Sequence, residues 1–159
     1  MHIEQEYFFW KLIHDLVVVQ GFDVLHMNTK EQEVWLEKEH HWKTHVVRLK
    51  QKQINWRNEL KRDVHITYQQ LKQNRQLFRG GKVVLHSLYV SEFPPVDEWQ
   101  GVTEELKNER FDSHVYYLGD ELKEKERRRF YKSFDIKDSI LDYKISEQEM
   151  ESILPYLKQ

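Results

Sequence analysis

The pattern of apolar and polar positions predicts a mostly buried first helix. From Glu4 to Gln20, the polar residues Glu4, Lys11 and Asp15 fall on one narrow stripe at helical spacing, and apolar residues fill most of the remaining positions. A helix that is apolar around most of its circumference packs against other elements, and we expect a sheet as its partner. Gly21 is the expected stop.

Three short strands are predicted next, at Phe22–Met27, Glu33–Glu37 and Thr44–Lys50. In the second, Val34 and Leu36 alternate with polar neighbours, which is the period of a half-buried strand, although Trp35 interrupts the pattern. Polar turn residues separate the three segments.

A long helix and a strong strand follow. Asn55 is in position to cap a helix from Trp56 to Phe78, whose apolar residues recur as one stripe, and Gly80-Gly81 is its expected end. The segment Lys82–Ser91 is rich in strand-forming residues.

The pattern weakens beyond Val96. We interpret the chain as one domain, 1–159, with a core of about residues 4–118 and a C-terminal segment 119–159. The elements predicted here are a helix at Asp97–Lys107, a strand at Ser113–Leu118, a charged helix at about Glu121–Tyr131 and a last helix at Glu147–Leu157.

The order helix, three strands, helix, strand indicates an α/β (α+β) protein with a mixed sheet flanked by helices. It is the α-β-β-β-α-β order of restriction-endonuclease-like (PD-(D/E)xK) cores. Element order alone establishes no activity, because one fold carries many functions.

Composition narrows the chemistry. The 159 residues include no cysteine, which excludes disulfides, thiolate zinc sites and cysteine nucleophiles and suits a reducing cytosol. Residues 1–20 lack the basic start and cleavage site of a signal peptide, and no window offers the run of about 20 apolar residues that a membrane span needs. We expect the fragment to be soluble.

The third predicted strand tests the nuclease interpretation. A nuclease of this fold holds its metal with an acid on the second strand and a Glu-x-Lys on the third. Here Lys50 is present, but Arg48 occupies the carboxylate position. Asp23 and Glu33 remain as acids, and an active metal-dependent nuclease would require Glu33 or Glu37 to replace Arg48. A scaffold without catalysis is the favoured interpretation.

Two groups are weak candidates for metal binding. His40, His41 and His45 lie in or beside one predicted loop and could ligate zinc or manganese. On the long helix, Glu59 and Asp63 share a face with Asn55 and could hold a hard cation weakly. Surface ion pairs with the neighbouring cations are the favoured interpretation of both carboxylates. His26, His65 and His86 are interpreted as isolated packed or surface residues.

A basic segment dominates the charge pattern. From Lys43 to Lys82 there are eleven Lys or Arg against Glu59 and Asp63, a local net charge of +9, although the whole chain carries −2. Anionic lipid headgroups and nucleic acid are both possible partners of such a surface, and a plain solvated helix face is the alternative. The candidate contacts on the long helix are Arg57, Lys61, Arg62, Lys72, Arg75 and Arg79.

Five segments, in order over residues 4–100, resemble the N-terminal cytosolic domain of bacterial rhomboid intramembrane proteases. They are Tyr7-x-x-Trp10-Lys11, Glu33-Val34-Trp35-Leu36-Glu37, Val47-Arg48-Leu49, Trp56-Arg57-Asn58-Glu59-Leu60-Lys61-Arg62-Asp63 and Ser91-Glu92-Phe93-Pro94-Pro95-Val96-Asp97-Glu98-Trp99.

This resemblance implies a parent protein that continues into transmembrane helices carrying a serine–histidine dyad, with the serine in Gly-x-Ser-Gly. The present chain would then be a non-catalytic regulatory or interaction domain on the cytoplasmic face of the membrane. Its partners would be the protease domain, anionic lipids or membrane-protein substrates, and nucleic acid is disfavoured. No cofactor is expected.

Metal-responsive regulation is known in this family, which draws attention to Glu59 and Asp63, but Lys52, Gln53 and Asn55 before them are poor ligands. The competing hypothesis is a stand-alone nucleic-acid-binding protein or degenerate nuclease.

Overall fold

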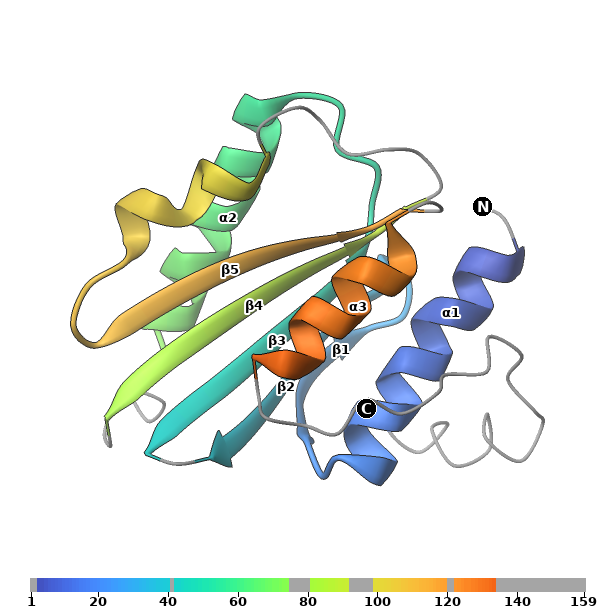
Figure 1. Ribbon diagram of the computed structural model, residues 1–159, viewed down its shortest axis with the longest axis horizontal. Helices are drawn as coiled ribbons and strands as arrows, with labels where there is room; N and C mark the ends of the chain where they lie inside the picture. The colour runs from blue at the N-terminus through green and yellow to red at the C-terminus, as the bar shows by residue number, and fades with distance from the viewer. Residues whose placement is uncertain (1–2, 41, 75–80, 92–98, 120–121, 134–159) are drawn as a thin grey trace.

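A five-stranded mixed sheet in the order β1-β2-β3-β4-β5 organises the protein (Figure 1). The computed structural model describes residues 3–40, 42–74, 81–91, 99–119 and 122–133. Strands β1 to β3 form an antiparallel meander, and β3, β4 and β5 are parallel to one another. The strands are β1 (Asp23–Asn28), β2 (Glu33–His40), β3 (Lys43–Gln51), β4 (Lys82–Val90) and β5 (Phe111–Leu118).

Helices cover both faces of the sheet (Figure 1). The helix α1 (Ile3–His14), with its π-helical extension η1 (Asp15–Val19), and α3 (Lys123–Lys132) lie on one face. The helix α2 (Arg57–Lys72) and the 3₁₀ helix η3 (Trp99–Leu106) lie on the other. The parallel pairs require these crossovers, because parallel strands cannot be joined by tight turns.

Alternation along the strands divides the apolar residues into two cores. On β3, Val47 and Leu49 join the core under α1 and α3, whereas Val46 joins the core under α2 and η3. Successive side chains of a strand point to opposite faces, so a sheet covered on both sides has buried side chains at nearly every position. On β4, every residue from Val83 to Val90 is buried.

The predicted α+β class is confirmed, with the expected order of helix, three strands, helix and strand. The predicted cap of the second helix is wrong, and the first helix departs from regular α geometry near its end. Trp56, in extended conformation, precedes the first turn of α2 in place of Asn55 and makes no side-chain capping bond. The first helix changes at Asp15 from α to π geometry, and Asp15 is buried and accepts a hydrogen bond from Tyr131.

Three further predictions meet the limits of the described residues or differ in detail. The predicted helix at Glu147–Leu157 lies outside the described residues, as do positions 75–78 of the predicted second helix. In the described part of the segment expected as a helix at Asp97–Lys107, Trp99–Leu106 form the 3₁₀ helix η3. Among the described residues, none of the helices is long and apolar enough to cross a bilayer.

Candidate functional site

A buried charged cluster centred on Arg48 lies between the sheet and α2. The Arg48 side chain is 4% exposed and donates two hydrogen bonds, from Nε to Glu33 Oε1 and from a terminal nitrogen to Asp63 Oδ2, both at 2.7 Å. Both carboxylates are largely buried. One guanidinium therefore joins a carboxylate of β2 to a carboxylate of α2.

Strand register places the charged groups on one face. Glu33 is paired with Lys50, and Trp35 with Arg48, so alternate positions of β2 and β3 all point toward α2. Asp63 comes from the second turn of α2, where it faces the sheet. The sequence forms the cluster only because β2 and β3 pair in this register, since a shift of one residue would turn Arg48 to the opposite face.

Three further side chains form hydrogen bonds or an ion pair with the two carboxylates. The indole N–H of Trp35 donates to Glu33 at 2.9 Å, and the hydroxyl of Tyr89, on β4, donates to Asp63 at 2.5 Å. The Lys50 ammonium lies 3.6 Å from the other oxygen of Glu33.

These contacts set the ionisation of the carboxyl groups. Burial would raise the pKa of Glu33, but the hydrogen bond and charge of Arg48 outweigh it and hold this pKa below its usual value. The pKa of Asp63 is lowered against burial in the same way, by Arg48 and then by the hydroxyl of Tyr89. Both groups are ionised at neutral pH, and burial with the charge of Asp63 raises the pKa of Tyr89 far above its usual value.

The cluster is arranged as a cross-link between elements. The guanidinium occupies the position between the two carboxylates, so a divalent cation would have to displace it before using both as ligands. A buried ion pair of this kind needs all its partners, because removing one leaves an uncompensated charge. Within the described ranges, no group of three His, Asp or Glu side chains is placed to ligate a metal.

The structure separates the two predicted metal candidates. Asp63 points into the protein toward Arg48, whereas Glu59 lies in a half-exposed pair with Lys52 at 3.6 Å. Arg48 stands in the register assumed in the sequence analysis, with Lys50 beside Glu33. The expectation that Asp63 makes an ordinary surface ion pair is wrong, because its partner is a buried arginine on the sheet.

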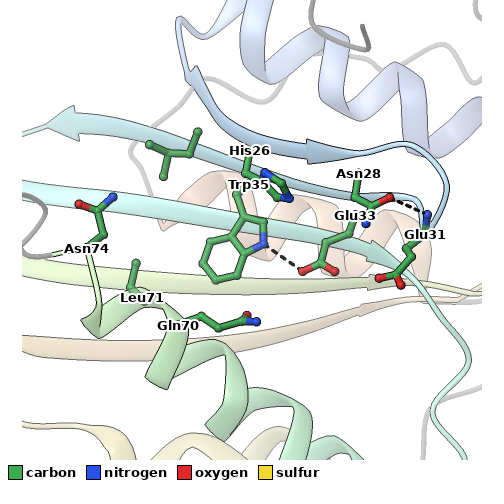
Figure 2. A pocket seen from close by; sticks show the side chains of 9 residues that line it. His26, Asn28, Glu31, Glu33, Trp35, Gln70, Leu71 and Asn74 are labelled. Carbon is green, nitrogen blue, oxygen red and sulfur yellow. Dashed lines mark hydrogen bonds between the residues drawn. The ribbon is translucent and has the colours of Figure 1, made fainter. Parts of the chain in front are cut away.

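A pocket of about 450 Å³ adjoins the cluster on the same side of the sheet (Figure 2). Figure 2 shows the Trp35 indole lying along the pocket, with its N–H directed at Glu33. Gln70 of α2 and Asn74 face it from the opposite side. No motif in the sequence indicated this pocket, because its lining comes from the β1–β2 hairpin and from the C-terminal end of α2, which are far apart in the sequence.

The predicted histidine site is replaced by a different grouping. His40 ends β2, His41 lies outside the described residues, and His45 is buried within β3 rather than exposed on a loop. His45 Nδ1 lies 3.0 Å from Nε2 of His86 on β4, and the rings of His86 and His114, on β5, are 5.6 Å apart. The interpretation of His86 as isolated is wrong.

The three grouped histidines favour the neutral form. Burial, followed by the charge of Lys43, lowers the pKa of His45 to about 4. Burial lowers the pKa of His86 well below its usual value, and that of His114 is lowered mainly by the same cause. In the short contact between His45 and His86, one neutral imidazole donates its N–H to the unprotonated ring nitrogen of the other. In the sequence, only the position of one histidine on each of three strands, β3, β4 and β5, could have indicated this grouping.

The basic residues predicted on the long helix are distributed unevenly. Arg57, Arg62 and Lys72 are exposed, and Lys61 is half-buried. Arg75 and Arg79 lie outside the described residues.

Comparison with protein-family models and with curated proteins found no match to this chain.

Proposed function

We propose that this chain is a non-catalytic regulatory or interaction domain of a rhomboid-family intramembrane serine protease, located at the cytoplasmic face of the membrane. Its partners are the transmembrane protease domain of the same protein, membrane-protein substrates and anionic lipid headgroups. The catalytic serine and histidine belong to the transmembrane part.

The observation that carries this proposal is that three of the resembling segments contact one another in the buried cluster around Arg48. Glu33 and Trp35 come from one segment, Arg48 from a second and Asp63 from a third, and all of them build the same buried cluster. Three separated parts of the likeness thus make one structural unit. This convergence supports the proposal that the resembling segments belong to one scaffold.

The same cluster argues against nuclease chemistry. In the restriction-endonuclease-like interpretation, the metal would sit near Glu33 and the third-strand position held by Arg48. A guanidinium hydrogen-bonded to both nearby carboxylates repels the cation that this chemistry needs. The alternative therefore reduces to a nucleic-acid-binding protein or degenerate nuclease on the same scaffold.

Proteolysis in membranes tests the proposal. The parent protein and a version lacking residues 1–159 would be compared for cleavage of a transmembrane substrate, with a catalytic-serine variant as the blank. We expect the truncated protein to keep its serine chemistry while its cleavage rate or substrate choice changes. Unchanged rate and selectivity on all substrates, with equal amounts of both proteins in the membrane, would refute a regulatory or recruiting role.

A further inference from the structure

Trp42, at the tip of the β2–β3 hairpin, is the most exposed of the large apolar side chains described, at 94%. Its backbone has φ of 68°, a left-handed conformation that is strained for a bulky residue. The backbone of Gly81 lies close to this tip: a Cβ at that position would be 2.3 Å from the Trp42 carbonyl oxygen. The fold therefore fixes a tip that presents an indole to solvent, with no internal packing to account for it.

A row of cations runs beside this tip. Lys43 is paired with Lys82 across β3 and β4, and the pairing of Val83 with Phe111 places Arg110 next to Lys82. Neighbouring strands are about 4.8 Å apart, so the three residues form a continuous row at the amino ends of the parallel strands. Lys43 and Lys82 are each an odd number of positions from Val46 and Val83, which belong to the core under α2, so both lysines lie on the face that carries α3. Arg110 is exposed in the bend just before β5.

The row keeps its positive charge uncompensated in the described part of the chain, where no carboxylate is within ion-pair distance of these three side chains. The nearest acid on β5, Asp112, is paired with His114 at 3.2 Å and with Lys107 at 3.8 Å. Glu39 and Glu109, which flank the region along the chain, are exposed to solvent.

We propose that Trp42 and the row formed by Lys43, Lys82 and Arg110 are the surface by which this domain contacts an anionic phospholipid bilayer. An indole with an apolar body and a polar N–H prefers the bilayer interface. Lysine and arginine beside it attract anionic headgroups. The inference rests on the proposed function, because a domain joined to a transmembrane protease lies beside a bilayer.

The geometry favours this tip over α2. On α2, the exposed basic residues Arg57, Arg62 and Lys72 are spread along the length of the helix, and the exposed positions Asn58, Ile66 and Gln69 between them carry no charge. The other exposed tryptophan, Trp56, precedes α2 at the far end of β3 from Trp42. A projecting tip with one indole and three cations also suits a flat bilayer better than the groove of a duplex.

Co-sedimentation of the 159-residue chain with vesicles tests the inference. Vesicles of phosphatidylcholine alone would be compared with vesicles that also contain phosphatidylserine. We expect binding only to the anionic vesicles, and a steep loss as salt is added. Trp42→Asn, which also suits the left-handed backbone, should weaken binding at least about tenfold, because it removes the indole that the bilayer would bury.

Charge variants and matched controls complete the design. Lys43→Glu with Lys82→Glu should abolish binding, whereas Trp56→Ala and Arg57→Glu with Arg62→Glu should leave it unchanged. Circular dichroism spectra establish that each variant is folded. Binding that survives the changes at the tip, or that is lost only with the α2 variants, would overturn the inference.

Two further outcomes would also overturn it. One is absence of vesicle binding by the native chain, and the other is tight binding to duplex DNA in its place. Neither changes the result of the cleavage comparison above, which needs no vesicle binding by the isolated chain. Failure of this inference is therefore distinguishable from failure of the proposed function.

Discussion

Arg48 of the central strand β3 reaches across to α2 and donates a hydrogen bond of 2.7 Å to Asp63. The same guanidinium is bonded to Glu33 on β2. Because Asp63 also accepts a bond from Tyr89 on β4, one cluster connects three strands and a helix.

Removing the guanidinium should destabilise the fold strongly. Arg48→Ala leaves Glu33 and Asp63 buried without their cation, and breaking a buried pair in this way costs about 3–5 kcal/mol. Urea unfolding measures the loss. The control is Lys52→Ala, which removes only the half-exposed pair with Glu59 and should cost less than about 1 kcal/mol. Equal losses in the two variants would contradict a structural role for the cluster.

Reversing the charge at position 48 should create a response to divalent cations. Arg48→Glu places a third carboxylate beside Glu33 and Asp63, which destabilises the fold by repulsion. Carboxylate oxygens are the ligands that Ca²⁺ and Mg²⁺ prefer, so either ion should restore part of the lost stability. Thermal unfolding with and without Mg²⁺ measures this effect. The native chain is the control, and a comparable Mg²⁺ stabilisation of the native chain would show that Arg48 does not exclude the cation.

Stability should decrease as the solution becomes acidic. The pKa of His45 is about 4 in the folded chain, below its usual value, so the unfolded chain takes up this proton first as pH falls below about 6.5. The contribution of neutral His45 to the free energy of unfolding is complete above about pH 6.5 and is lost as the pH falls toward about 4. For His45 alone, going from about pH 7.5 to about pH 5 should cost roughly 2 kcal/mol.

Protonation of Glu33 and Asp63 also lowers the stability of the fold, at lower pH than the protonation of His45 does. Their pKa values are lowered in the folded state, so their contribution is present above the unfolded values and lost as pH falls through the folded ones. Urea unfolding at a series of pH values, with a variant at position 45, separates the contribution of His45 to stability from that of the two carboxylates. His45→Gln, which can still bond His86 but cannot titrate, should flatten the decline near pH 5 that the native chain shows. Identical pH profiles for this variant and the native chain would count against a buried neutral His45.

The hairpin tip should respond in opposite directions to two substitutions. Gly81→Ala adds a Cβ only 2.3 Å from the Trp42 carbonyl oxygen at a φ of 100°, so we expect a loss of at least about 1–3 kcal/mol. Trp42→Asn relieves the left-handed strain at position 42 and should be neutral or stabilising. Denaturant midpoints measure both. A stabilising Gly81→Ala would mean that the two loops do not contact each other.

Local pattern was sufficient to predict most of the elements. Alternation around Val34 and Leu36, and the dense run of strand formers after Gly81, mark strands that the structure contains. Helical spacing located α2, although its first residue was placed one position early, because Asn55 is a strong capping type and Trp56 is not. Tertiary position, and not capping preference, sets that boundary.

The Arg48 cluster and the histidine grouping depend on contacts between residues far apart in the sequence, which a local sequence pattern does not reveal. The unusual Arg48 was apparent on the strand, but its partners lie 15 positions away on either side, in β2 and in α2. The meeting of His45 with His86 requires the parallel pairing of β3 and β4, which joins residues 41 positions apart. Strand order and register decide both, and periodicity within one segment specifies neither.

We propose that this chain is the extramembrane domain of a rhomboid protease, and the native reading frame downstream of Gln159 tests this proposal most directly. The account predicts several apolar spans, with Gly-x-Ser-Gly in one and a histidine in a later one. A stop codon soon after Gln159 would contradict the claim.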